Sequence, residues 1–252
     1  MLLIDKLSYR SKLRYVNASE KLMYAVLTLI LCILSHSVRV AALVFVINGI
    51  LTVGKGGIPL SRYIRLLMIP TAFLIAGTAA IVINISKVPM DAFALELGEW
   101  YITGSMAGIY RALELCATAL SAVTCLYFLS LNTVMTDILD ALRKLHFPSL
   151  LIELMLLIYR FIFVLFQTAS AITVSQQARL GNRDFKTRVR SFGAMGSALF
   201  ILALKRSNML YDAMESRCYD GNIRVLTRMQ PARAGEIAVI AAIELILVLV
   251  WI

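Results

Sequence analysis

Long apolar runs, each broken by a short polar or glycine-rich stretch, dominate the pattern of this chain. The run over 22–53 would measure roughly 48 Å as one helix, whereas the hydrocarbon core of a bilayer is about 30 Å thick. Because Ser35, His36 and Ser37 interrupt it, we read the run as a hairpin of two short spans. The pattern predicts membrane spans over 20–35, 38–54, 63–85, 105–131 and 235–252.

A sixth apolar helix, predicted over 149–178, differs from these spans because it carries a polar stripe. Glu153, Arg160 and Gln167 recur every seven residues and so share one helix face. A lipid-facing span would place that stripe in hydrocarbon at a high cost in free energy. We therefore predict that this helix lies at the membrane surface and packs on other helices. The alternative is a sixth span whose stripe faces the interior of the bundle.

Lysine and arginine are unevenly distributed, and this orients the chain, since they gather in cytoplasmic loops. The first 21 residues hold five of them, and residues 173–233 hold eleven against four acids. Residues 86–104, an irregular stretch, hold one lysine against three acids. The N-terminus and residues 173–233 are therefore expected inside and 86–104 outside. This assignment requires that 149–178 does not cross the membrane.

Composition supports an all-α polytopic membrane protein with about five transmembrane helices and long cytoplasmic amphipathic helices. Hydrophobic residues make up 60% of the chain and charged residues only 16%, against about 25% in soluble proteins. The predicted regions are N-terminal transmembrane helices over 1–131, a cytoplasmic helical region over 132–233 and a C-terminal transmembrane helix over 234–252. Although the net charge is +10, no nucleic-acid-binding pattern accompanies it, so the partner is the lipid bilayer and not a nucleic acid.

Sites for ATP, metal or a cofactor are not expected on this chain. The stretch Gly54-Lys55-Gly56 is only a fragment of a phosphate-binding loop, so ATP hydrolysis would belong to a partner. His36 and His146 stand alone on opposite sides of the membrane, and the four cysteines lack metal-ligand spacing. Charged residues also fall within predicted spans, where we favour pairing in the bundle or an interfacial position over a functional site: Arg111, Glu114 and Glu244.

A helical pattern continues over 185–217, with Gly221 placed where a C-capping glycine belongs. Its apolar positions step at intervals of three, four and seven: Phe185, Val189, Phe192, Gly196, Leu199, Ala203, Leu210 and Met214. The run of small residues around Gly193, Gly196 and Ser197 would let another helix approach closely. We expect 149–178 to be that helix, and a hinge at the glycines is the other interpretation.

Each of these two long helices is expected to end in an arginine, Arg179 after Ala178 and Arg217 after Ser216. A lone exposed arginine is usually a solvated surface residue. Two at matching positions on consecutive helices indicate that each docks onto an acidic group, because guanidinium offers several hydrogen bonds in a fork.

Four segments together carry a resemblance that covers nearly the whole chain. They are Ala178-Arg179-Leu180-Gly181, the stretch from Lys205 to Gly221, the opening from Leu3 to Ser11, and Ile152 to Val164. With these segments the chain closely resembles the transmembrane T component of energy-coupling factor transporters. The most similar subgroup is the cobalt-type permease, the CbiQ family.

This resemblance implies a scaffold and not an enzyme. In the family, the T component holds a membrane substrate-binding subunit and two ATP-binding cassette ATPases on the cytoplasmic side. Two coupling helices each end in an Ala-Arg-Gly-like signature whose arginine docks in a groove of one ATPase. By match these arginines are Arg179 and Arg217, although the signatures here read Ala-Arg-Leu and Ser-Arg-Cys.

The function implied is therefore energy coupling in an ATP-driven importer for cobalt ions, in a bacterial or archaeal cytoplasmic membrane. ATP would be used by the partner ATPases and the metal held by the substrate subunit, with no cofactor bound by this chain. Coupling of nickel or vitamin uptake is the alternative within the family. A stand-alone carrier would need a polar site at the membrane midplane, and a polytopic membrane enzyme would need clustered acids or histidines at the membrane face.

Overall fold

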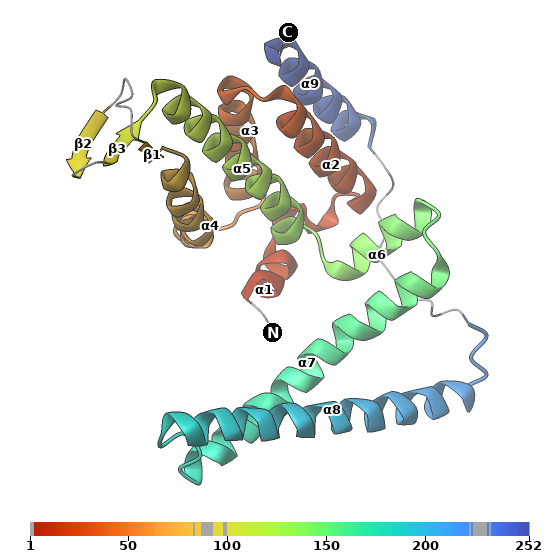
Figure 1. The fold of residues 1–252 in the computed structure, drawn as a ribbon. Coiled ribbons are helices and arrows are strands. Elements are labelled where there is room, and N and C mark those ends of the chain that lie inside the picture. Colours follow the sequence, from red (N-terminus) through yellow and green to blue (C-terminus); the bar gives the residue numbers. More distant parts are fainter. Residues whose placement is uncertain are drawn as a thin grey trace. The chain divides into compact units, whose positions relative to one another are not determined.

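The computed structural model describes residues 3–82, 84–86, 93–97, 100–221, 223, 231 and 233–251. Helices dominate these residues (Figure 1). In chain order the elements are α1 (Leu3–Arg10), the 3-10 helix η1 (Lys12–Tyr15), α2 (Ala18–Ser35), α3 (Val38–Ile50), the π-helical turn η2 (Leu51–Lys55), α4 (Leu60–Val82), β1 (Asn84–Ser86), β2 (Phe93–Leu97), β3 (Trp100–Gly104), α5 (Met106–Asn132), α6 (Met135–Lys144), α7 (Ser149–Ala178), α8 (Phe185–Glu215) and α9 (Ala234–Trp251).

The predicted helical, polytopic membrane architecture is confirmed. Among the described residues, six helical segments are long and apolar enough to cross a membrane: α2, α3 with η2, α4, α5, α7 and α9. Five of them coincide with the predicted spans to within a few residues. The sixth is α7, which length and composition alone count as a possible span. Its position at the membrane surface remains a prediction.

The hairpin predicted around Ser35 to Ser37 forms as expected. His36 takes the left-handed conformation, with φ 44° and ψ 32°, and Ser37 is extended, so α2 stops and α3 starts within two residues. The two helices share a core that α5 and α9 complete. Its buried residues are Cys32, Val40, Ala41, Val44, Cys125 and Leu247.

Three short antiparallel strands lie between α4 and α5, where the sequence analysis expects an irregular stretch. Their order in the sheet is β1-β3-β2. Asn84 pairs with Thr103 and Phe93 with Gly104, so the sheet joins the end of α4 to the start of α5. Lys87, Asp91 and Glu99, three of the charges used to place this stretch outside, lie beyond the described residues.

Contacts divide the chain into two compact units, each of which is described by itself. One comprises residues 2–141 and 228–252, and α5 is its central helix, packed on α1, α2, α3 and α4. The other comprises residues 142–227, in which α7 and α8 pack on each other. Helix α6 begins in the first unit, where Val134, Leu139 and Ala141 are buried. The five predicted spans therefore fall in one unit and α7 in the other.

Buried polar side chains tie the helices of the first unit together. The Tyr24 hydroxyl of α2 donates to Asn48 Oδ1 of α3 at 2.9 Å, and Asn48 Nδ2 donates to Cys125 Sγ of α5 at 3.2 Å. Ser121 Oγ of α5 donates to the Ala41 carbonyl at 2.6 Å. Because a polar group in hydrocarbon must find its partner within the protein, these bonds fix how the three helices pack.

Two of the three charged residues within spans have local partners, although they do not pair with one another or with Arg111. Glu244 of α9 accepts from the Thr28 hydroxyl of α2 at 2.9 Å. Glu114 of α5 lies with one oxygen 3.7 Å from His36 Nδ1. Each acid therefore pairs with a neighbouring helix end or helix face, while the Arg111 side chain is exposed.

Candidate functional site

Helix α7 ends in a Schellman motif that places Arg179 directly before a residue in the left-handed conformation. That residue is Leu180, with φ 58°. Its N–H donates to the Gln177 carbonyl at 3.0 Å, and the N–H of Gly181 donates to the Gln176 carbonyl at 2.8 Å. This pair of bonds satisfies carbonyls that the end of a helix leaves free.

Helix α8 ends in the same motif. Cys218 has φ 56°, and its N–H donates to the Glu215 carbonyl at 2.9 Å. The N–H of Tyr219 donates to the Met214 carbonyl at 3.1 Å. Arg217 therefore occupies the same position in its motif as Arg179 does in its own. Both arginine side chains are exposed, as are those of Ala178 and Ser216.

The capping residue of α8 differs from the one predicted. Gly221 does have a positive φ, 86°, but it lies three residues beyond Cys218, which closes the helix.

The family signature that the sequence resembles has glycine after the arginine, where Leu180 and Cys218 stand here. Since glycine adopts positive φ without steric cost, the left-handed conformation explains why that position suits glycine. Leu180 and Cys218 therefore both adopt the conformation that glycine would favour at this position.

A set of hydrogen bonds clamps the turn that carries Arg179. Ser191 Oγ of α8 donates to the Gly181 carbonyl at 2.8 Å, and Gln176 Nε2 of α7 donates to the Ser191 carbonyl at 2.8 Å. A Cβ on Gly181 would lie 2.8 Å from the Gln176 carbonyl oxygen and 2.9 Å from Ser191 Oγ. Sequence reasoning missed the roles of Gln176 and Ser191, because neither stands in a recognisable motif.

A second clamp holds the segment that follows Arg217, and Glu153 of α7 is its centre. The Tyr219 hydroxyl donates to Glu153 Oε2, and the N–H of Ile223 donates to Glu153 Oε1 at 3.0 Å. The Ile223 carbonyl in turn accepts from the Arg143 guanidinium at 3.0 Å. Glu153, only 4% exposed, was predicted as part of a polar stripe, and its partners account for a buried carboxylate there.

The hydrogen bond to Glu153 also changes the acidity of Tyr219. It raises the pKa of the Tyr219 phenol, because only the neutral phenol can donate to the carboxylate. Partial burial and the negative charge of Glu153 act in the same direction. The Tyr219 phenol is therefore protonated at neutral pH and can donate to Glu153.

The contact between α7 and α8 involves the predicted helices but not the predicted residues. Thr173 Oγ1 lies 3.4 Å from Met195 Sδ, and Gln176 contacts Ser191 as described. Ser191 and Met195 are four positions apart and share a helix face. Gly193, Gly196 and Ser197 are exposed, and a Cβ on either glycine would meet nothing within 4 Å. Helix α8 continues through these glycines without a break.

This arrangement is suited to docking a partner. Two exposed guanidinium groups, each with five N–H donors, lie at equivalent ends of two helices. The segment that follows each arginine is held by hydrogen bonds to the other helix of the pair. Within the described part of the chain, no three His, Cys, Asp or Glu side chains gather as a metal site would require.

Comparison with known proteins gives consistent matches along the chain. The family model CbiQ, described as "Cobalt transport protein", matches residues 10–229, a range that includes both arginines. The "Cobalt transport protein CbiQ" of Salmonella typhimurium is 28% identical over 88% of this chain and 99% of its own length. The "Putative fused cobalt transport protein CbiMQ" of Methanocorpusculum labreanum is 31% identical over 97% of this chain and 40% of its own. The "Energy-coupling factor transporter transmembrane protein EcfT" of Staphylococcus aureus is 28% identical over 86% of this chain and 83% of its own.

Proposed function

Because the chain belongs to the CbiQ family of cobalt transport proteins, we propose that it couples ATP hydrolysis to the import of cobalt ions. Membership itself makes the chain a T component of an energy-coupling factor type transporter. It is thus a multi-pass membrane protein and a transport subunit, not an enzyme. The cargo and the way the ATPases are coupled are the parts that we propose.

The observation that carries the proposal is the equivalence of Arg179 and Arg217. Each stands directly before the left-handed residue of a Schellman motif, and each is exposed. Two equivalent exposed arginines could bind equivalent sites on two copies, or two homologous forms, of one partner. We propose that each enters a groove of one ATP-binding cassette ATPase, with Ala178 and Ser216 at the rim, and binds acidic or carbonyl oxygens there.

The clamps supply the rigidity that transmission of force requires. Gly181 is held to Ser191, and Glu153 holds Tyr219 and Ile223, so the backbone next to each arginine is tied to a neighbouring helix. Closure of the ATPases would shift α7 and α8 together. The exposed face with Gly193, Gly196 and Ser197 would then meet the membrane substrate-binding subunit, since small residues permit close helix contact.

ATP and metal are assigned to partners. The sequence has no phosphate-binding loop, so the ATPases would bind and hydrolyse ATP. The relative from Methanocorpusculum labreanum is named as a fusion, and this chain covers only 40% of it. The remaining length leaves room for a second transport component. We infer that such a component, as a separate subunit, binds the ion for this chain.

The proposal is tested by co-purification of the chain with its ATPase subunits. The variants are Arg179→Ala, Arg217→Ala and the double variant. Loss of hydrogen bonds to a charged group should weaken ATPase retention about tenfold per arginine. Arg183→Ala is the matched control, because Arg183 is exposed in the same turn but outside the motif position. ATP-driven cobalt uptake into vesicles should fall with the same variants.

Two results would contradict the proposal. Uptake that remains unchanged in the double variant would show that the arginines do not couple the ATPases. If wild-type chain retained no ATPase while remaining folded, the coupling role itself would be wrong. Uptake of nickel or a vitamin in place of cobalt would correct the cargo and leave the coupling mechanism standing.

A further inference from the structure

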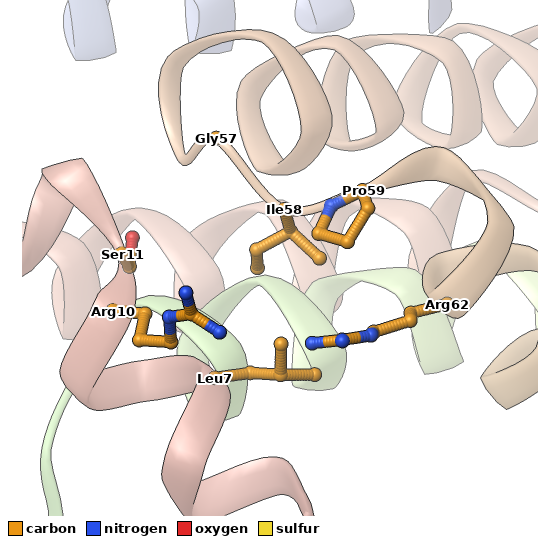
Figure 2. A pocket seen from close by; sticks show the side chains of 7 residues that line it. All are labelled: Leu7, Arg10, Ser11, Gly57, Ile58, Pro59 and Arg62. Atoms are coloured by element: carbon orange, nitrogen blue, oxygen red, sulfur yellow. The ribbon is translucent and has the colours of Figure 1, made fainter.

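A cavity of about 400 Å³ lies in the first unit between the end of α1, the loop that precedes α4 and the first turn of α4. Two arginines reach into it from opposite sides. Figure 2 shows the guanidinium groups of Arg10 and Arg62 pointing toward one another across the cavity, with Leu7 between them. The complete lining is Leu7, Arg10, Ser11, Gly57, Ile58, Pro59 and Arg62.

The positive charge of this cavity is not balanced by the residues that surround it. No lining residue is acidic, and neither arginine side chain forms an ion pair or a hydrogen bond among the described residues. Two cations that face each other repel, and an anion placed between them removes that repulsion. Guanidinium groups bind oxyanions through paired N–H donors. The cavity therefore has the chemistry of an anion site.

The walls are held in place without any ligand. The N–H of Lys12 donates to the Gly56 carbonyl at 3.1 Å, which joins η1 to the loop. Ser11 Oγ donates to Asn132 Oδ1 at 2.7 Å, which joins the same segment to α5. Leu7 and Ile58 are buried in one apolar cluster with Leu131. Because the backbone on both sides is fixed, binding would order little more than the two arginine side chains.

The cavity lies at the end of a membrane-spanning helix, which identifies the source of the anion. Arg62 belongs to the first turn of α4, one of the candidate spans. Ile69 and Phe73, seven and eleven positions after Arg62, lie on the same face of that helix as Arg62 and are exposed. This end of α4 is the cytoplasmic end according to the distribution of lysine and arginine. Anionic lipid headgroups lie at that level and on that side of a membrane.

We propose that Arg10 and Arg62 hold the phosphate group of an anionic phospholipid of the cytoplasmic leaflet. The phosphate lies between the two guanidinium groups, and the acyl chains pass along the exposed apolar face of α4. Leu7, Ile58 and Pro59 provide the apolar part of the cavity, which a free phosphate ion would leave unused. The bound lipid joins α1 to the start of α4 and stabilises the first unit.

The test uses the intact chain, purified in a neutral detergent and delipidated. Phosphatidylglycerol, phosphatidylcholine and inorganic phosphate are added separately, and the thermal unfolding midpoint and the lipid retained in native mass spectra are measured. The variants are Arg10→Gln and Arg62→Gln. Arg65→Gln is the matched control, because Arg65 is an exposed arginine one turn further along the same helix and does not line the cavity.

Phosphatidylglycerol is expected to stabilise wild type and Arg65→Gln, and each of the other variants should bind it about tenfold more weakly. Equal responses of all four proteins would overturn the site. If inorganic phosphate stabilised wild type as well as the lipid did, with the same dependence on Arg10 and Arg62, the lipid source would be wrong.

Discussion

At the scale of single residues, Gly181 and Gly193 show that glycines in one segment can have opposite requirements. Gly181 has no room for a side chain, because the Gln176 carbonyl and Ser191 Oγ approach it to within 3 Å of where a Cβ would stand. Gly193 lies in the middle of α8 and faces open space. One glycine is required by packing, whereas the other leaves its helix less stable than alanine would.

These positions form a matched pair of substitutions. Gly181→Ala should destabilise the unit of residues 142–227 by about 1–3 kcal/mol, since overpacking forces a shift of the turn. Gly193→Ala should stabilise the isolated chain by about 0.5–1 kcal/mol through helix propensity. Thermal unfolding in detergent measures both. The interpretation of the turn fails if Gly181→Ala unfolds no earlier than wild type.

At the scale of elements, α7 and α8 form an antiparallel pair clamped at both ends. Ser191 closes the end near Arg179, and Glu153 closes the end near Arg217. Neither helix has a buried apolar core of its own: Ile152 and Glu153 are the buried residues of α7, and α8 has none. Polar contacts therefore determine how the two ends are held.

Substitution of Glu153 is expected to change the hydrogen–deuterium exchange of the Ile223 N–H and the titration of the Tyr219 phenol. Glu153→Leu should release the Ile223 N–H and speed its hydrogen–deuterium exchange, whereas Tyr219→Phe leaves that bond in place and should change the exchange less. Glu153→Gln should lower the pKa of Tyr219 toward its usual value of about 10, since the carboxylate that raises it is gone. Tyrosinate absorbance follows that titration.

The sign of this pH effect follows from the raised pKa. The folded chain holds the Tyr219 proton more tightly than the unfolded chain does, so the contact contributes stability below a pH of about 10. That contribution is lost as the pH rises through the higher, folded-state value. Glu215→Gln, at an exposed carboxylate on α8, is the control and should change neither the exchange nor the titration.

At the scale of the whole molecule, the number of spans decides on which side α8 lies. Helices α2, α3, α4 and α5 return the chain to the side of the N-terminus. If α7 lies at the surface, Cys218 is cytoplasmic and the end of α9 is outside. If α7 crosses, both positions exchange sides. The eleven lysine and arginine residues over 173–233 favour the surface position, since such residues gather in cytoplasmic segments.

Labelling of Cys218 tests this topology, because its side chain is exposed while Cys32 and Cys125 are buried. In a Cys116→Ser background, an impermeant maleimide should label Cys218 in inside-out vesicles and not in intact cells. A cysteine introduced as Arg39→Cys, in the first turn of α3, should show the opposite pattern. A reporter fused after Ile252 should be active outside. Labelling of Cys218 in intact cells would establish six spans.

The sequence alone determined the membrane-spanning helices, because the lengths of its apolar runs set where each of them begins and ends. The predicted spans over 20–35 and 38–54 match α2 and α3 with η2, because hydropathy and bilayer thickness set where a span begins and ends. The break at His36 and the two helices over 149–178 and 185–217 followed from the same local pattern. The positions of Arg179 and Arg217 at helix ends were also predicted, since a motif is contiguous in the sequence.

Tertiary structure alone decided what surrounds those arginines. Ser191 meets Gly181 ten residues away, and Glu153 meets Tyr219 and Ile223 across 66 and 70 residues. Such hydrogen bonds leave no periodic pattern in the sequence, because one donor and one acceptor can pair at any separation along the chain. The contact of α7 with α8 at Met195, and not at Gly193 or Gly196, depends on the rotation of each helix about its axis. The cavity of Arg10 and Arg62 likewise needs two segments about fifty residues apart, which their packing on α5 and the hydrogen bond from Lys12 to Gly56 bring together.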